Sequence, residues 1–217
     1  MRARLVCVGL LTVVALTSCG EPAPVDMSLL TGEPCEPPCW QGLVPGVSTE
    51  EEVLQYMADS NYVGHHYRDP FAGSNTIWWQ STLAGRSQRT YNAFGIRGGM
   101  LAGMVILLDY EFTLEELLIK YGDPEKFRAQ WESGSSANAE VTLYYPRLGI
   151  IPQLVLRPSD GYHELQPESK VIRVWYFPPT SLDGLFYLAG DIPFPDKRKH
   201  AEIVLQDWQG CGRIELR

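Results

Sequence analysis

The sequence predicts an α+β fold of two tandem modules, each with one or two short helices and an antiparallel sheet of about four strands, followed by a C-terminal helical segment. Two observations lead to this prediction. A helix-start signature occurs twice, at Thr49 and at Thr113, and the residues that follow align without gaps. After each helix, runs rich in β-branched and aromatic residues alternate with turn signals. Consecutive strands joined by short turns are expected to be antiparallel.

The first element, residues 1–18, has the features of a lipoprotein signal peptide. Arg2 and Arg4 give a positive start, and residues 5–16 form an apolar run that is too short to span a bilayer permanently. The small residues directly before Cys19 resemble the site at which bacterial lipoproteins are cleaved and acylated. We therefore expect an extracytoplasmic protein that the lipid on Cys19 anchors to a bacterial membrane.

Residues 19–38 are expected to be the lipid anchor and an extended tether. The segment contains five prolines and little apolar pattern. Proline-rich chain of this kind lifts a folded domain away from the headgroups.

The charge balance excludes some partners. The whole chain carries a formal net charge of −8, and removal of Arg2 and Arg4 with the signal peptide changes it to −10. An acidic chain offers no basic surface for phosphates, so nucleic acid is not an expected partner. The lipid bilayer is expected to be contacted through acylated Cys19 alone.

Residues 39–110 are predicted to form the first module. Thr49 and Glu52 have the spacing of a capping box, in which each side chain satisfies a backbone N–H of the other residue. Arg97-Gly98-Gly99 is a hairpin turn signal. The predicted strands are Asn61 to Tyr67, Thr76 to Gln80, Thr90 to Ile96 and Leu101 to Leu108.

Residues 111–178 are predicted to form the second module. Thr113 and Glu116 repeat the capping box, and Gly122 is placed to end a helix over Leu114 to Tyr121. The predicted strands are Phe127 to Glu132, Glu140 to Tyr145, Ile150 to Leu156 and Val171 to Phe177.

Residues 179–217 are predicted to be a C-terminal segment with a helix. Ser181-Leu182-Asp183-Gly184-Leu185-Phe186 is a weaker third copy of the helix start, and Gly184 lowers its helix propensity.

Several short motifs resemble known lipoprotein families. The stretch from Gly42 to Val53 resembles the helix entry of BamE/SmpA-like lipoproteins, and Tyr121-Gly122-Asp123-Pro124 resembles the Gly-x-Pro that ends their helix. The tandem arrangement is similar to the β-lactamase-inhibitor-protein-like fold, and the stretch from Cys35 to Gly42 is similar to a further group of bacterial lipoproteins. The resemblance implies helix-plus-sheet modules whose concave sheet binds a partner protein. The first repeat departs from the pattern, because Ala58-Asp59-Ser60 replaces the Gly-x-Pro.

Three cysteines remain beyond Cys19, and an oxidising compartment allows them to form a disulfide. Extended geometry before Pro37 and Pro38 would hold Cys35 and Cys39 too far apart for a bridge. We therefore expect a bridge from Cys39 or Cys35 to Cys211. A local bridge, which needs a cis bond or a sharp bend, and Cu(I) binding by the two thiolates of Cys35 and Cys39 are the alternatives.

The sequence contains none of the common catalytic motifs that we sought, so we expect neither an enzyme nor a cofactor or metal site. Both faces of the predicted strands are apolar, although helices would cover only one of them. The second face would pack on the other module or form an exposed binding surface, whose candidate residues are Trp78, Trp79, Arg173, Trp175 and Phe177. The expected function is non-catalytic binding of an envelope protein, with capture of a small ligand or glycan as the alternative.

Overall fold

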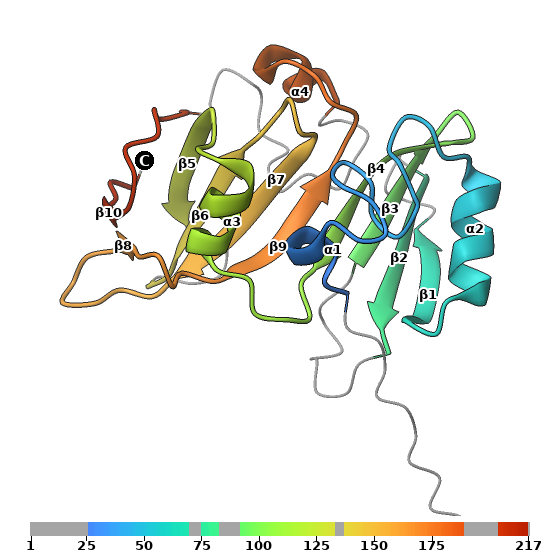
Figure 1. The fold of residues 1–217 in the computed structure, drawn as a ribbon, viewed down its shortest axis with the longest axis horizontal. Helices are drawn as coiled ribbons and strands as arrows, with labels where there is room; N and C mark the ends of the chain where they lie inside the picture. Colours follow the sequence, from blue (N-terminus) through green and yellow to red (C-terminus); the bar gives the residue numbers. More distant parts are fainter. Residues whose placement is uncertain (1–25, 70–74, 83–91, 133–136, 189–203, 217) are drawn as a thin grey trace, which may run out of the picture.

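The computed structural model describes residues 26–69, 75–82, 92–132, 137–188 and 204–216. Within these residues the chain forms four α-helices and ten strands (Figure 1). The helices are α1 (Ser28–Thr31), α2 (Glu50–Asp59), α3 (Leu114–Tyr121) and α4 (Leu182–Leu188). The strands are β1 (Val63–Asp69), β2 (Asn75–Ser81), β3 (Asn92–Arg97), β4 (Met100–Leu107), β5 (Lys126–Trp131), β6 (Ala139–Tyr144), β7 (Ile150–Leu156), β8 (Glu164–Leu165), β9 (Val171–Tyr176) and β10 (Gly212–Arg213). The α+β class and each predicted main strand are confirmed.

Both predicted capping boxes are present. The hydroxyl of Thr49 accepts from the backbone N–H of Glu52, whose carboxylate accepts from the N–H of Thr49, and α2 begins at the next residue. Thr113 and Glu116 make the same reciprocal pair at the start of α3. Because each box satisfies N–H groups that have no partner within the helix, both helices begin where the sequence predicts.

The eight main strands form one antiparallel sheet in the order β1-β2-β3-β4-β9-β7-β6-β5. The structure therefore does not confirm two separate modules with a sheet each. Strands β4 and β9 join the two halves edge to edge, with Val105 opposite Trp175 and Leu107 opposite Arg173. This pairing satisfies the backbone groups of two strands that would otherwise be sheet edges.

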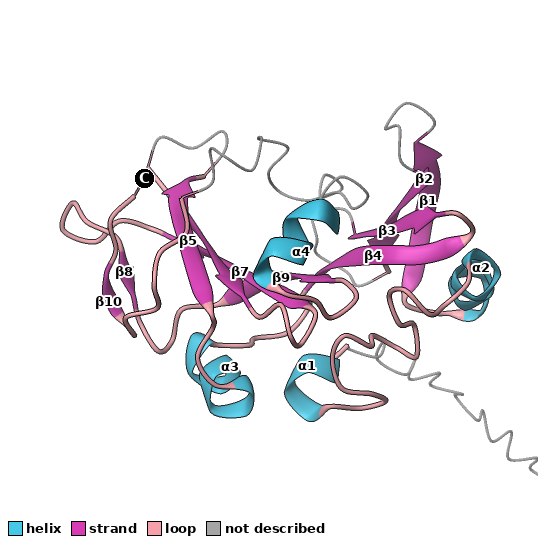
Figure 2. Cartoon of the chain, turned by 90° about the horizontal axis from the view of Figure 1, so that it is seen from above, coloured by secondary structure: helices cyan, strands magenta, loops and turns pink. Residues whose placement is uncertain are grey.

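Helices cover both faces of the sheet. Helices α1, α2 and α3 lie on one side and α4 lies on the other (Figure 2). The larger core, between the sheet and the first three helices, includes Trp40, Trp79, Phe94 and Tyr176. The smaller cluster, beneath α4, includes Trp175, Phe177 and Leu185. Both apolar faces of the strands thus have a partner within the chain.

The folded body begins inside the predicted tether. Asp26, Ser28 and Leu29 are buried, and Leu29 of α1 is part of the core. The Lys120 ammonium and the Tyr121 hydroxyl, both on α3, donate to the carbonyl oxygen of Leu29 at 3.0 Å and 2.8 Å. The tether prediction is therefore wrong for residues 26–38, because burial of an apolar side chain and donors on α3 hold this proline-rich segment in place.

The predicted C-terminal helix is observed as α4, and the last described residues return to the other end of the sheet. Gln206 exchanges two backbone hydrogen bonds with Phe127 of β5, at 3.0 Å and 2.8 Å. The ring of Trp208 packs edge-on against Phe127 at 6.0 Å, and its indole N–H donates to Asp123 at 3.0 Å. Strand β10 then pairs with β8.

Candidate ligand-binding pocket

A pocket of about 320 Å³ opens where the N-terminal segment meets the end of α2 and the turn into β1. We call it the Asp26 pocket. Its volume lies at the lower end of the range typical of small-molecule sites. Its lining residues are Asp26, Gln41, Tyr56, Asp59, Ser60, Asn61 and Tyr62.

Asp26 is the most deeply buried acid of the pocket, with 6% of its surface exposed. One carboxylate oxygen accepts from the backbone N–H of Ser28 at 3.0 Å and from the side-chain amide of Gln41 at 3.1 Å. The other oxygen accepts from the indole N–H of Trp40. Among the described residues no lysine, arginine or histidine forms an ion pair with this carboxylate. Within the described part of the chain, its charge is therefore stabilised by hydrogen bonds and not by a cation.

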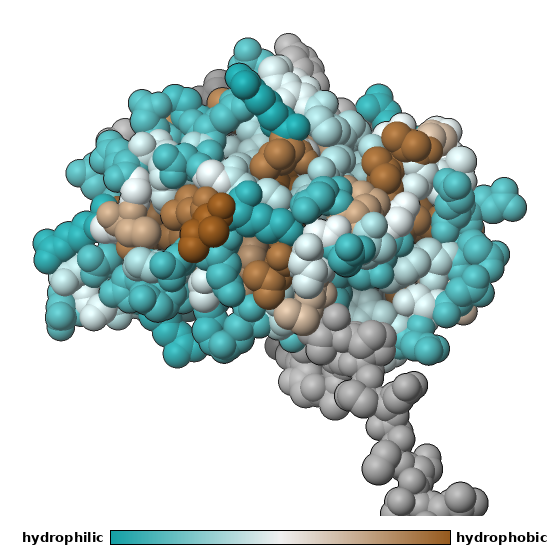
Figure 3. Space-filling model, viewed as in Figure 1, coloured by the Kyte–Doolittle hydropathy of each residue, from teal (hydrophilic) through white to brown (hydrophobic). Residues whose placement is uncertain are grey.

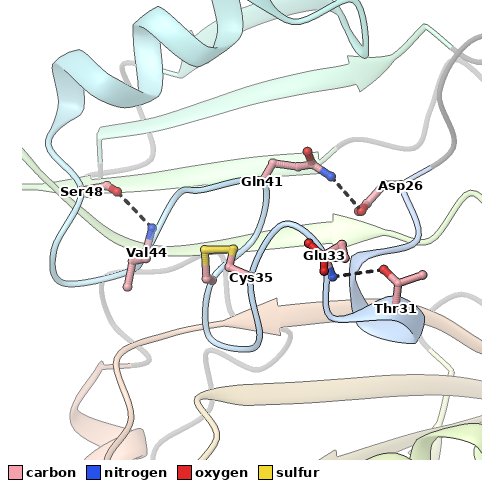
Figure 4. Close-up of a disulfide and its surroundings, with 8 residues drawn as sticks. Asp26, Thr31, Glu33, Cys35, Gln41, Val44 and Ser48 are labelled. Carbon is pink, nitrogen blue, oxygen red and sulfur yellow. Dashed lines mark hydrogen bonds between the residues drawn. A yellow bond between two sulfur atoms is a disulfide. The ribbon is translucent and has the colours of Figure 1, made fainter.

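A tight turn presents Gln41 to Asp26. The backbones of Trp40 and Leu43 exchange two hydrogen bonds of 2.9 Å, and the central residues Gln41 and Gly42 both have positive φ, 51° and 82°. This pattern is that of a two-residue hairpin turn of type I′, in which glycine and asparagine are favoured. Figure 4 shows the Gln41 side chain directed at Asp26 from this turn. A glutamine in left-handed geometry is uncommon, and here it delivers an amide to the pocket.

A disulfide between Cys35 and Cys39 closes the loop just before this turn (Figure 4). The expectation of a bridge to Cys211 is wrong, and Cys211 is an exposed free thiol. The peptide bond between Pro37 and Pro38 is cis and the N–H of Cys39 donates to the carbonyl of Glu36 at 3.1 Å, so the loop folds back and the two Cα atoms are 5.7 Å apart. In this oxidised form Cys35 and Cys39 offer no thiolates to Cu(I). Among the described residues there is no group of three or more His, Cys, Asp or Glu side chains that could hold a metal ion.

Neighbouring aromatic side chains hold the two tyrosine rings of the pocket in place. The buried ring of Trp40 lies edge-on to Tyr56 at 5.4 Å and tilted to Tyr62 at 6.2 Å. Tyr62 also packs edge-on against Trp79 at 5.6 Å, and its hydroxyl donates to the carboxylate of Asp109. Rings held by several neighbours lose little further freedom when a ligand binds, so this wall is preorganised.

The pocket has a negative character. Burial is the main cause that raises the pKa of Tyr56 to about 12, and the charge of Asp26 adds to the rise. Burial also raises the pKa of Tyr62, with further contributions from Asp109 and Asp26. Asp59 supplies a second carboxylate, which accepts from the Gln55 amide at 2.6 Å. Among the described residues that line the pocket, two are acids and none is basic.

The residues expected to form an exposed binding surface are mostly interior. Trp79 faces the larger core with 0% exposure, while Trp175 and Phe177, at 1% and 0%, lie under α4. Trp78 is partly buried against the same cluster, and the Arg173 guanidinium lies 5.4 Å from the centre of the Trp175 ring. The expectation that these side chains form an exposed surface is therefore wrong, because residues of the C-terminal segment, Leu182 and Leu185 of α4 and Leu205, pack against that face.

The pocket was not predictable from local sequence patterns. Asp26 falls in the predicted tether, and Tyr56, Asp59 and Tyr62 fall in an ordinary helix and strand. A local sign that the chain near Asp26 is folded is the tryptophan, Trp40, directly after a cysteine.

Comparison with models of known protein families, with curated proteins and with solved structures finds no match to this chain. Among the described residues, none of the helices has the length and apolar character needed to cross a bilayer. Cys19 and the predicted signal peptide lie outside the described residues.

Proposed function

We propose that this protein is a membrane-anchored extracytoplasmic lipoprotein that captures a small ligand in the Asp26 pocket without transforming it. The observation that carries the proposal is the preformed pocket of about 320 Å³, which combines a buried carboxylate, a side-chain amide and two fixed tyrosines. Such pockets suit reversible recognition, since a few placed polar groups orient a ligand against aromatic walls. Capture of a ligand is favoured over binding of an envelope protein because Trp175 and Phe177 are buried.

Some apolar side chains are exposed on the described part of the surface. The face that carries α1 and α3 is mainly hydrophilic, and its apolar patches are separated by polar side chains (Figure 3). The large hydrophobic residues with exposed surface, among them Val47, Ile119 and Trp131, are widely spaced in the sequence. Exposed apolar residues that stand singly are normal on protein surfaces.

The proposed anchor is close to the pocket. Asp26 is the seventh residue after Cys19, a span of at most about 25 Å of extended chain. A lipid on Cys19 would therefore hold the Asp26 pocket near the membrane surface. Labelling with palmitate tests this: a Cys19→Ala variant should lose the label, while Cys7→Ala, a change at the other cysteine of the predicted leader, should keep it. Retention of label by Cys19→Ala would overturn the anchor.

We also propose that the two halves of the sheet derive from one repeated unit of a helix followed by four strands. Matching backbone contacts support this. The capping Thr49 forms an isolated bridge with Met100 at the start of β4, and the capping Thr113 forms one with Lys170, just before β9. Both of these strands then meet at the centre of the sheet. The pocket belongs to the first half only, since its residues come from the segment between Asp26 and Tyr62.

The test of the function is recovery of a bound molecule. The full-length protein would be purified gently from its native membrane and examined by native mass spectrometry. A variant with a filled pocket, Ser60→Trp, is compared with a surface control on the far half, Ser159→Trp. A ligand mass present in the wild type and the control but absent from Ser60→Trp supports the proposal. Equal recovery from all three would overturn it.

A further inference from the structure

We propose that the Asp26 pocket selects a small organic ammonium cation. This inference rests on the proposed function and names the class of ligand. The cationic nitrogen would lie against the carboxylates of Asp26 and Asp59, and its carbon groups against Tyr56 and Tyr62.

The buried charge of Asp26 favours a cationic ligand. A carboxylate that is 6% exposed has lost most of its hydration, and three donors replace only part of it. Lys120, which contacts the N-terminal segment, is engaged elsewhere: its ammonium donates to the carbonyl oxygens of Leu29 and Leu30 and lies 3.5 Å from the carboxylate of Glu36. A cationic ligand would supply the missing opposite charge, whereas an anion would add a third negative charge beside Asp26 and Asp59.

The aromatic wall of the pocket also favours a cation. Tyrosine rings attract a cation toward their faces, most strongly when the site is shielded from water. Tyr56 and Tyr62 both line the pocket and are both held by Trp40. This combination of rings with a carboxylate is suited to alkylated or primary ammonium groups, because it offers an apolar contact to the carbon atoms and an acceptor to the charge.

The described residues of the pocket suit an organic cation better than a metal ion. Divalent metals need several oxygen, nitrogen or sulfur ligands converging on one point. Among the described residues no group of three or more His, Cys, Asp or Glu side chains converges in this way. Gln41 is oriented toward Asp26, so its amide nitrogen, a donor, occupies one acceptor position that a metal would need.

The experiment is calorimetric titration of the full-length protein in neutral detergent with three probes of similar shape: choline, its uncharged analogue 3,3-dimethylbutanol, and the anion 3,3-dimethylbutyrate. We expect choline to bind and to exceed both analogues by on the order of tenfold or more in affinity. Asp59→Asn should weaken choline on the order of threefold to tenfold, since Asp59 touches the pocket from the end of α2 without holding the N-terminal segment. Asp26→Asn should weaken it further.

Because Asp26→Asn also disturbs structural hydrogen bonds, its fold is checked by circular dichroism, and Asp59→Asn keeps the test informative if that variant unfolds. Asp183→Asn, on α4 at the opposite face, is the matched control and should bind choline like the wild type. Equal binding of choline and dimethylbutanol, both abolished by Ser60→Trp, would overturn charge selection and leave small-ligand capture intact. If the protein purified from its membrane carries no ligand and none of the three probes binds, both proposals fail.

Discussion

The indole N–H of Trp40 donates a hydrogen bond to the carboxylate of Asp26, fourteen residues earlier in the chain. This bond joins the segment before α1 to the turn that follows the disulfide. It also links the core to the pocket, since Trp40 is fully buried while Asp26 lines the cavity. The stability of the fold and the geometry of the site therefore depend on the same side chain.

Replacement of Trp40 by Phe should lower the free energy of unfolding by about 2–4 kcal/mol. The smaller ring leaves a void against Tyr56 and Tyr62 and removes one donor from a buried carboxylate. Urea unfolding followed by circular dichroism measures the change. Trp131→Phe is the control, because Trp131 is 56% exposed, and it should change stability by less than about 0.5 kcal/mol. Equal effects of the two changes would contradict the central position of Trp40.

Gly149→Ala should be clearly more destabilising than Gly161→Ala. Both glycines have positive φ, 68° and 83°, so both variants strain the backbone by about 1 kcal/mol. An added Cβ at Gly149 would also lie 2.8 Å from Cβ of Pro38 and closer still to the carbonyl oxygen of Phe177, whereas at Gly161 it meets open space. We expect a difference of about 2 kcal/mol or more between the two melting experiments. A difference near zero would mean that the disulfide loop does not rest on Gly149.

Thiol titration should distinguish the observed disulfide from the one that the sequence favours. In the processed protein, with Cys19 acylated, one thiol should react under native conditions and be lost in Cys211→Ser, whereas reduction should release two more. Opening the Cys35–Cys39 loop should cost about 2 kcal/mol, because a loop of so few residues constrains the unfolded chain only modestly. A reactive thiol at Cys35 or Cys39 in the unreduced protein would contradict this connectivity.

Alkaline pH should unfold the protein cooperatively. Burial raises the pKa of Tyr56 to about 12 and moves those of Tyr62, Tyr110 and Tyr176 further upward from 10.0. The unfolded chain therefore releases protons first as the pH rises above about 10, and the folded state loses stability from that point upward. Tyrosinate absorbance and circular dichroism should change together in one transition. Gradual ionisation of all tyrosines without loss of fold would show that these hydroxyls are accessible.

Local features of the fold were predictable, because their causes lie within a few residues. The capping pairs at Thr49 and Thr113 satisfy helix donors three residues away, and the alternation of side chains marks each strand. The joining of β4 to β9 was not predictable in the same way, because two apolar faces are equally consistent with two sheets packed together and with one sheet covered on both sides.

The site depends on contacts between separate segments, and local sequence rules do not predict these contacts. The rule that residues before proline are extended placed Cys35 and Cys39 too far apart, and the cis bond between Pro37 and Pro38 removes that separation. Asp26 follows a proline-rich stretch and acquires its role only when Trp40 and Gln41 approach it. The apolar face that carries Trp175 is consistent with packing on another module or with an exposed surface, and in the structure Leu182 and Leu185 of α4 cover it instead.

The exchange of hydrogen bonds between Gln206 and Phe127 has a consequence for how copies of this protein behave at high concentration. Strand β5 stands last in the sheet, and an uncovered last strand offers backbone groups on which another chain can add a strand. Gln206 occupies two of these groups, and Trp208 covers the neighbouring ring. The C-terminal segment thus prevents another chain from adding a strand at these two groups, and copies of the protein at high concentration would remain separate on this side.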